Sequence, residues 1–358
     1  MKCFICENNI NDEDRINFHP TTMHKIIDFD EKKIVFCSSC GFGGIDKPIE
    51  NESLEFYYSE VYSGISSKSK YQEYKNIIGD YPKNKRAFSQ ISLLSQFLDK
   101  NKKLNVLEIG SGRGDFMKLF LKIFNKSDYY VSETQEQSVK VLKMNNKNSV
   151  NLFSKKFDGD KNLDFKNKFD LIFMSHSLEH FNPNQIKNIV SNIYFMLNEN
   201  ALFFCEVPNA DLRKFTHEAI VPHLSFFSQE SFEYLCKDTN LKILFNSTCG
   251  DDQLKNLKTF NHKVEQNKKN NSFQFIPDSK NQKILWNIKT IKDHKRYEFK
   301  GFLKYLLFRI LGSKNYEVLL NRISKYSSQY FIDILSSKEF KYHNDGEYIR
   351  IIAKKEQS

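Results

Sequence analysis

The feature that most constrains the fold is a buried strand that runs directly into three alternating glycines and then into a helix. The strand covers residues 104–109, the glycines are Gly110, Gly112 and Gly114, and apolar residues at helical spacing follow over 116–124. Since glycine has no side chain, a ligand can lie against the backbone at the carboxyl end of the strand. This unit predicts an open parallel sheet with a ligand-binding edge.

Strands and helices continue to alternate beyond this unit. Further strands are expected at 129–132, 150–153, 169–175, 201–207, 241–247 and 348–353, and further helices at 135–143, 184–197 and 228–239. Ser228 is the expected N-cap of the last of these helices. This alternation predicts an α/β protein with a doubly wound, Rossmann-like sheet of seven strands.

Four of the seven cysteines form two pairs with the spacing of metal-binding turns, Cys3 with Cys6 and Cys37 with Cys40. Two such turns aim four sulfurs at one point, which is the tetrahedral set that zinc prefers. Gly41 follows the second pair, where the turn needs a permissive backbone. We therefore expect a closed, structural zinc site. Disulfides are the alternative, and a reducing compartment disfavours them.

Composition and charge set further limits. The chain of 358 residues contains 40% hydrophobic and 27% charged residues, and its apolar runs are too short to span a membrane. No apolar segment typical of a signal peptide lies near its start. These observations predict a soluble, cytoplasmic protein and exclude a membrane channel, a secreted disulfide-rich domain and a collagen-like fibre.

The predicted organisation has five parts, which differ in pattern and charge. They are a zinc-binding ribbon (1–46), a helical connector (47–100), the core (101–254), a mostly helical insertion before the last strand (255–342), and that strand with a tail (343–358). Residues 255–300 hold 12 Lys/Arg against 4 Asp/Glu, so most of the net charge of +10 lies in this segment.

Carboxylates flank the glycine loop, Glu108 on one side and Asp115 on the other. They would repel the pyrophosphate of a dinucleotide, whose motif also spaces its glycines differently. They suit a ligand that carries an ammonium or sulfonium group. An NAD-type enzyme and a purely structural turn remain as alternatives.

The segment 106–116 resembles motif I of class I S-adenosylmethionine (SAM)-dependent methyltransferases, and later segments follow in the family's order. Residues 131–133 end the second strand, and residues 169–181 resemble the fourth strand and its loop. The resemblance implies that Glu133 binds the ribose hydroxyls and that residues 157–158 contact adenine. The cofactor-binding residues predicted in this way are Glu108, Gly110, Ser111, Gly112, Gly114, Glu133, Phe157, Asp158 and Ser175.

A narrower resemblance covers roughly residues 1–250. The paired cysteines ahead of this core, with the segment 57–63 between them, are similar to the zinc-containing sugar methyltransferases, notably the deoxysugar C-methyltransferases. This implies methylation of a nucleotide-linked sugar in glycan biosynthesis. The C-methylating relatives carry a glutamate directly before the histidine at the position of His223, where this chain has Pro222. Since an enolate needs a better supported base than an alkoxide-like nucleophile, we expect O-methylation, with C-methylation as the alternative.

Three histidines follow strands at their carboxyl ends, where substrates bind in such sheets. Histidine is a suitable general base because its ordinary pKa lies near neutrality. His223 is the first candidate, since it matches a family histidine that faces the substrate. His176, expected next to the transferred methyl group, is the second. His180 matches the family's loop histidine, and a structural role beside Glu179 is its alternative.

The basic insertion allows three interpretations. It could attract an anionic nucleotide sugar, bind RNA in an RNA methyltransferase, or be a solvated surface. Its charge is mostly lysine in Asn-rich sequence, without the arginine stripes and aromatics that favour RNA, so nucleic acid is not the expected partner. An apolar stripe at 302–310 indicates core or homodimer packing, with an interfacial membrane helix as the alternative. A non-catalytic SAM-binding scaffold is the last alternative.

Overall fold

The structure, a computed structural model, describes part of the chain. The described residues are 1–11, 15–17, 32–56, 85–112, 114–135, 138–139, 142–143, 150–153, 157, 163–214, 223–252, 342–344 and 346–356. The chain divides into two compact units, and the first, comprising 1–63, 86–255 and 338–358, contains every described residue except Lys85. The predictions for residues 57–84 and for nearly all of the basic insertion, including the apolar stripe, lie outside the described residues.

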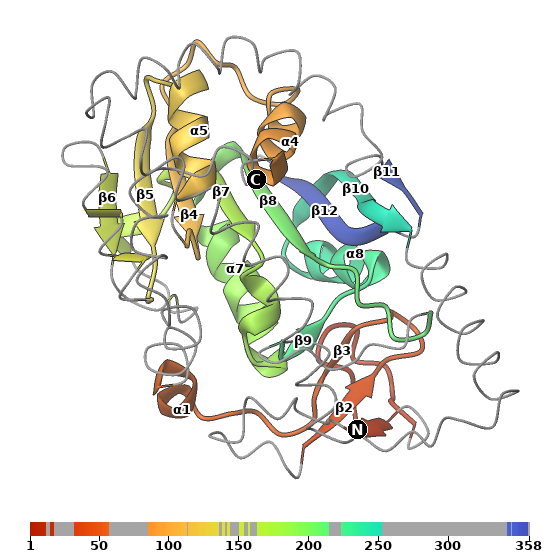
Figure 1. Cartoon of the computed structure of the whole chain (residues 1–358). Helices are drawn as coiled ribbons and strands as arrows, with labels where there is room; N and C mark the ends of the chain where they lie inside the picture. The colour runs from red at the N-terminus through yellow and green to blue at the C-terminus, as the bar shows by residue number, and fades with distance from the viewer. Residues whose placement is uncertain are drawn as a thin grey trace, which may run out of the picture. The chain divides into compact units, whose positions relative to one another are not determined.

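A sheet with the strand order β11-β10-β12-β8-β7-β4-β5-β6 forms the centre of the first unit (Figure 1). Its parallel strands are β4 (Asn105–Ile109), β5 (Asp128–Ser132), β6 (Val150–Phe153), β7 (Phe169–Ser175) and β8 (Leu197–Pro208). The antiparallel strands are β10 (Leu241–Asp252), β12 (Gly346–Lys355) between β8 and β10, and the two-residue β11 (Tyr342–His343). The predicted sheet of seven strands is confirmed, and β11 is an addition at its edge.

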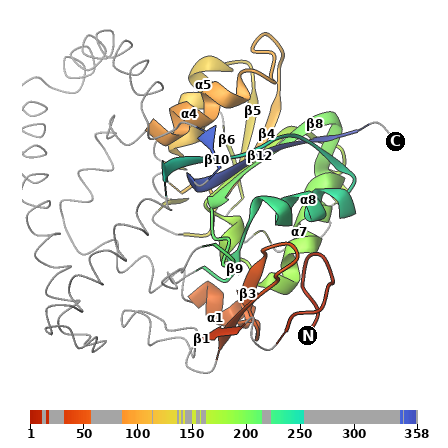
Figure 2. The same cartoon turned by 90° about the vertical axis from the view of Figure 1, so that its right-hand side faces the viewer.

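Helices cover both faces of this sheet (Figure 2). One face carries α4 (Lys85–Leu94) and α5 (Asp115–Ile123), and the other carries α7 (Ile186–Met196) and α8 (Gln229–Asp238). Because both faces are covered, the central strands are apolar almost throughout. None of the described helices is long and apolar enough to cross a bilayer.

The start of α8 shows why the local sequence folds as predicted. The Ser228 hydroxyl accepts a hydrogen bond from the Ser231 backbone N–H at 3.0 Å, and the Ser231 hydroxyl accepts one from the Ser228 N–H at 3.1 Å. This reciprocal capping satisfies two backbone donors that would otherwise lack partners. The predicted N-cap at Ser228 is confirmed, and it determines where the chain leaves β9 and begins α8.

The N-terminal segment forms a second, small antiparallel sheet of β1 (Arg15–Asn17), β2 (Lys33–Phe36), β3 (Gly43–Ile45) and β9 (Ser225–Phe226). The fourth strand, β9, comes from the loop region that follows β8. The N-terminal sheet is therefore completed by the core, and the short helix α1 (Asn51–Phe56) follows it. This pairing places β3 beside the residue that precedes β9, since the Ile45 N–H donates to the Leu224 carbonyl at 3.1 Å.

The connection is also held by side chains. Asn182 donates to the Ile49 carbonyl at 2.7 Å and accepts from the Ile49 N–H at 2.9 Å, in place of a backbone ladder. Leu54 and Ile45 pack with Leu224 and other buried apolar residues in one cluster. The N-terminal segment and the core thus share a packed interface within the first unit.

Candidate active site

All three glycines of the loop after β4 adopt left-handed backbone, with φ of 74° at Gly110, 54° at Gly112 and 74° at Gly114. A Cβ atom at Gly110 would lie 2.1 Å from the Ser177 hydroxyl, so Gly110 is closely packed. A Cβ atom at Gly112 would meet no atom of the described residues within 4 Å. The outer turn of the loop therefore borders open space, as the sequence predicts for a ligand-binding loop.

Two polar groups at this loop are arranged to hold a ligand. Glu133, at the carboxyl end of β5, accepts the Gly112 N–H at 2.6 Å and the Thr134 and Gln135 N–H groups at 2.8 Å. Burial raises the pKa of Glu133, while these backbone donors favour its charged form. The Ser111 hydroxyl is buried and has no hydrogen-bond partner among the described residues. An acceptor and an unsatisfied hydroxyl thus border the open space, which fits the polar groups of SAM.

Glu108 does not have the role that the sequence suggested. It is 3% exposed and accepts a hydrogen bond from the Tyr129 hydroxyl at 2.9 Å, beneath α5. Burial raises the pKa of Glu108 to about 8, so this carboxyl is mostly protonated at neutral pH. Asp115 is exposed in the first turn of α5, where a negative charge stabilises the helix. The geometry therefore does not support selection of a cationic ligand by carboxylates on both sides of the loop. Glu108 lies beneath α5 and is mostly neutral, whereas Glu133 accepts a hydrogen bond from the loop.

Three further residues are predicted cofactor contacts, Phe157, Asp158 and Ser175. Phe157 is partly buried and packs against the main apolar cluster. Asp158 lies outside the described residues. Ser175 accepts from the Gln90 amide at 2.8 Å and donates to Glu206 at 3.3 Å, which makes it part of a buried polar network.

Glu206, near the carboxyl end of β8, is the centre of that network. It is fully buried and accepts a hydrogen bond from the Arg350 guanidinium of the neighbouring strand β12. Arg350 also donates to the Ser89 hydroxyl of α4 at 2.7 Å. Although burial raises the pKa of Glu206, Arg350 and the nearby His176 and Arg86 lower it well below its usual range. Sequence reasoning missed this pair because its members are 144 positions apart.

His176 lies between two carboxylates directly after β7. Its Nδ1 is 3.3 Å from Glu179 Oε1 and its Nε2 is 3.3 Å from Glu206 Oε1. Burial opposes protonation, but these carboxylates raise the pKa of His176 to about 9. Its backbone is left-handed, with φ of 52°, a conformation that is costly outside glycine and concentrates at functional sites. At neutral pH His176 is therefore an imidazolium, which does not accept a proton.

The other two predicted histidines come together around Glu179. The 3-10 turn η5 (Leu178–His180) carries Glu179 and His180, and His223 enters just before β9. The His180 and His223 rings are 5.1 Å apart, and His223 Nε2 is 4.0 Å from Glu179 Oε1. The Leu224 N–H donates to the Glu179 carbonyl at 2.8 Å and so fixes the two segments. Glu179 is a functional candidate that the sequence indicated only as a support for His180.

The four paired cysteines meet as predicted. Cys3 Sγ lies 3.6 Å from Cys40 Sγ, and Cys6 Sγ lies 3.5 Å from Cys37 Sγ. All four sulfurs lie within 4.8 Å of one another, and none is in a disulfide. Sulfurs bound at 2.3 Å around a tetrahedral zinc ion would be separated by roughly 3.8 Å. The cluster therefore has the dimensions of a four-thiolate metal site.

The two cysteine turns share one backbone design. Gly41, after the second pair, has φ of 71° and donates its N–H to the Cys37 carbonyl at 2.8 Å. Glu7, after the first pair, has φ of 63° and donates to the Cys3 carbonyl at 3.2 Å. The glycine at the second turn was predicted from the sequence. In the first turn a glutamate, Glu7, adopts the same left-handed conformation, and its residue type gave no sign of this in the sequence.

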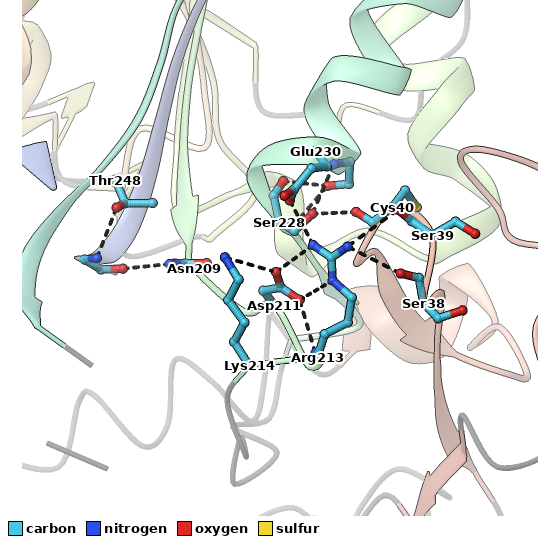
Figure 3. A network of polar contacts seen from close by, with 12 residues as sticks. Ser38, Ser39, Cys40, Asn209, Asp211, Arg213, Lys214, Ser228, Glu230 and Thr248 are labelled. Carbon is cyan, nitrogen blue, oxygen red and sulfur yellow. Dashed lines mark hydrogen bonds and ion pairs between the residues drawn. The ribbon is translucent and has the colours of Figure 1, made fainter. Parts of the chain in front are cut away.

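Arg213 connects the second cysteine turn to the core (Figure 3). Its guanidinium binds Asp211 through two hydrogen bonds of 2.7 and 2.8 Å, and reaches Glu230 in the first turn of α8 at 2.9 Å. It also donates to the carbonyls of Ser38 and Ser39 at 3.4 and 3.5 Å. The Ser228 hydroxyl donates to the Cys40 carbonyl. The cysteine cluster is thus fastened to both sides of the chain segment that contains His223.

Substituting Gly112 with alanine tests whether the open space at the loop is the SAM site. We expect Gly112→Ala to weaken SAM binding at least tenfold, because its Cβ would enter the ligand's space, and to cost about 1–2 kcal/mol of stability from the left-handed backbone. Isothermal calorimetry and thermal unfolding measure the two effects. Gly250→Ala, at φ of 99° in β10, is the control for backbone strain. SAM affinity that stays the same in Gly112→Ala would contradict this placement.

Comparison with known proteins agrees with the fold. Residues 83–245 match a family described as "Methyltransferase domain". Similar solved structures include SAM-dependent methyltransferases from Archaeoglobus fulgidus (15% identity, 76% of this chain and 94% of that chain, TM-score 0.41) and Aquifex aeolicus (18%, 51% and 93%, 0.38). Another is phosphoethanolamine N-methyltransferase 2 of Haemonchus contortus in complex with S-adenosyl-L-methionine (13%, 85% and 60%, 0.45).

No curated protein sequence matches the chain. The family match covers the strands of the glycine loop, the helices on both faces and the segment that carries the three histidines. The match of residues 83–245 to a methyltransferase domain indicates that the protein is a transferase.

Proposed function

We propose that the protein transfers a methyl group from SAM to a hydroxyl of a nucleotide-linked sugar, with His223 as the general base. The observation that carries this proposal is the position of His223. It lies at the carboxyl edge of the sheet, where ligands bind in such folds, with a buried carboxylate 4.0 Å from its Nε2. A carboxylate beside an imidazole stabilises the imidazolium that forms when the ring accepts a proton.

The residues around the glycine loop would hold the cofactor. Ser111 and the open backbone at Gly112 would contact one part of SAM. The Glu133 carboxylate would accept hydrogen bonds from its ribose hydroxyls. Bound SAM supplies an electrophilic methyl group. What this chain adds is alignment of the acceptor with that group and acceptance of the hydroxyl proton.

The choice among the three histidines follows from their surroundings. His176 is an imidazolium at neutral pH, since two carboxylates raise its pKa to about 9, so it suits orientation of Glu179 and Glu206 better than proton acceptance. His223 contacts Glu179 from the side of the N-terminal sheet. We therefore assign the proton to His223 and give His180 a supporting position beside it.

Carbon methylation is the second candidate, and Glu179 is the observation that favours it. The sequence argument against it was the lack of a carboxylate directly before His223. Glu179 brings a carboxylate to this histidine from a different element, the turn η5, and could support it in the same way. Enolate chemistry would still need stabilisation of the developing oxyanion in addition to a base. Transfer to a hydroxyl needs the base alone, and it remains our proposal.

The charge of the chain fits an anionic substrate. Arg86, which is 40% exposed, lies beside Glu206 at the carboxyl edge, with its guanidinium 4.5 Å from the centre of the Tyr348 ring. The lysine-rich segment 255–300 would raise the local concentration of a diphosphate-linked sugar through long-range attraction. The same charges would attract RNA, so the substrate test below includes RNA as a possible methyl acceptor.

We also propose that the four-thiolate cluster binds structural zinc. Four cysteine sulfurs close a tetrahedral shell and leave no position for substrate, which is the pattern of a structural site. This cluster is connected to β9 by strand pairing and to the start of α8 by a hydrogen bond, so it would hold the segment that carries His223.

Zinc content and stability test this assignment. We expect the purified chain to contain one equivalent of zinc, and Cys37→Ser to lose it and unfold at a lower temperature, because the free energy of metal binding contributes to folding. Elemental analysis and thermal unfolding provide the measurements. Cys236→Ala, at a buried cysteine outside the cluster, should keep the zinc. Retention of zinc by Cys37→Ser would count against the four-thiolate site.

The substrate proposal is tested by incubating the protein with SAM and a panel of nucleotide sugars, with and without a keto group, together with structured RNA. Mass spectrometry should show the mass gain of one methyl group on a nucleotide sugar, and fragmentation should place it on oxygen. A methyl group on carbon next to a ketone would support the second candidate instead. Methylation of RNA alone would overturn the sugar assignment.

Removal of the base should separate binding from chemistry. We expect His223→Ala to bind SAM with the affinity of the wild type and to lose turnover by roughly 10²–10⁴-fold, the usual contribution of a general base. Calorimetry and the mass-spectrometric assay measure the two properties. His343→Ala, in the edge strand β11, is the control histidine. Turnover near that of the wild type in His223→Ala would remove this residue from the proton transfer.

A further inference from the structure

A second group of metal-ligating side chains lies apart from the cysteines, at Glu179, His180 and His223. We infer that these three residues form a binding site for a divalent transition-metal ion, separate from the four-thiolate cluster. Their ligand atoms all lie within 4.8 Å of one another, and they come from two segments that a backbone hydrogen bond holds together. The inference does not depend on the sugar substrate proposed above.

The state of Glu179 is the first observation that points to an ion. Its side chain is 2% exposed, and neither carboxylate oxygen has a hydrogen-bond partner among the described residues. Two histidines approach this carboxylate, with His176 Nδ1 at 3.3 Å and His223 Nε2 at 4.0 Å from Glu179 Oε1. A buried carboxylate without hydrogen bonds is costly unless a cation lies against it.

His176 supplies only part of that compensation. Its Nδ1 approaches Glu179 Oε1 at 3.3 Å, and its Nε2 is equally close to Glu206. The structure gives Glu179 Oε1 no hydrogen-bond partner among the described residues, so the contact with His176 at 3.3 Å does not replace the hydrogen bonds that Glu179 lost on leaving water. The second oxygen of Glu179 has no partner at all among the described residues, and it remains available to an ion.

The donor set is the second observation. Two imidazoles and one carboxylate suit zinc, cobalt, nickel and iron in the divalent state, whereas calcium and magnesium prefer oxygen alone. Neighbouring ligand atoms around such an ion are separated by roughly 3.0–3.5 Å. The 4.0 Å between His223 Nε2 and Glu179 Oε1 would have to shorten by about half an ångström, which a rotation of the half-buried His223 ring can provide.

Three protein ligands leave coordination positions open, which distinguishes this site from the closed cysteine cluster. An ion bound to Nε2 of His223 uses the lone pair to which the proposed function assigns the hydroxyl proton. The ion and the proton would therefore compete, and an ion at this site would inhibit a His223-dependent reaction. The site is thus proposed as a place of metal binding, whatever the acceptor of the methyl group.

The test is equilibrium dialysis of the full-length protein, with its cysteine cluster loaded with zinc, against Co²⁺. We expect one equivalent of cobalt per chain, with the visible absorption of a nitrogen- and oxygen-bound ion and without the charge-transfer bands of cobalt thiolates. Both His223→Ala and Glu179→Gln should abolish this equivalent and leave the zinc content unchanged. Glu199→Gln, at an exposed position at the start of β8, should bind cobalt like the wild type.

Three results would overturn the proposal. They are no cobalt bound beyond the cysteine cluster, a bound equivalent that survives in both variants, or thiolate bands showing that cobalt has exchanged into the cysteines. Circular dichroism reports whether Glu179→Gln folds. If this buried substitution prevents folding, His223→Ala decides the question, because the His223 side chain is 19% exposed and His176 stays beside Glu179 in that variant.

Discussion

Two carboxylates buried at the carboxyl edge of the sheet, Glu206 and Glu179, constrain the arrangement of everything around them. A buried carboxylate is stable only with a cation or with hydrogen bonds close by. Arg350 reaches Glu206 from β12, and His176 stands between the two acids in a strained left-handed conformation. These contacts hold β7, β8 and β12 together at the carboxyl edge of the sheet. The residues that compensate the buried carboxylates therefore also determine where the candidate site lies.

The N-terminal segment extends this edge. Through the pairing of β3 with β9, and through Arg213, the cysteine cluster is fastened to the chain on both sides of His223. In the proposed function, this fastening orients His223 before substrate binds, which lowers the entropy lost on binding. The cysteine cluster would then affect the proposed reaction without contacting any reactant.

Much of the fold could be predicted from the sequence, because its signals are local. Apolar runs marked the strands, Ser228 marked the start of α8, and three glycines marked the loop. The site depends on contacts that no local pattern reveals. Glu206 meets Arg350 across 144 positions, and Glu179 meets His223 from a segment that is distant in sequence and leads into β9. Glu108 shows the same limit, since this carboxyl is next to the loop in sequence but lies beneath α5 and is mostly neutral.

The proposed reaction depends most on binding of SAM by the glycine loop and Glu133. Calorimetric titration of SAM into the wild type and Glu133→Gln tests this binding without knowledge of the acceptor. We expect one SAM per wild-type chain and binding weakened by about 1–3 kcal/mol in the variant, from the loss of charge-assisted hydrogen bonds. A wild type that binds no SAM, or a variant that binds it equally well, would contradict this placement of the cofactor.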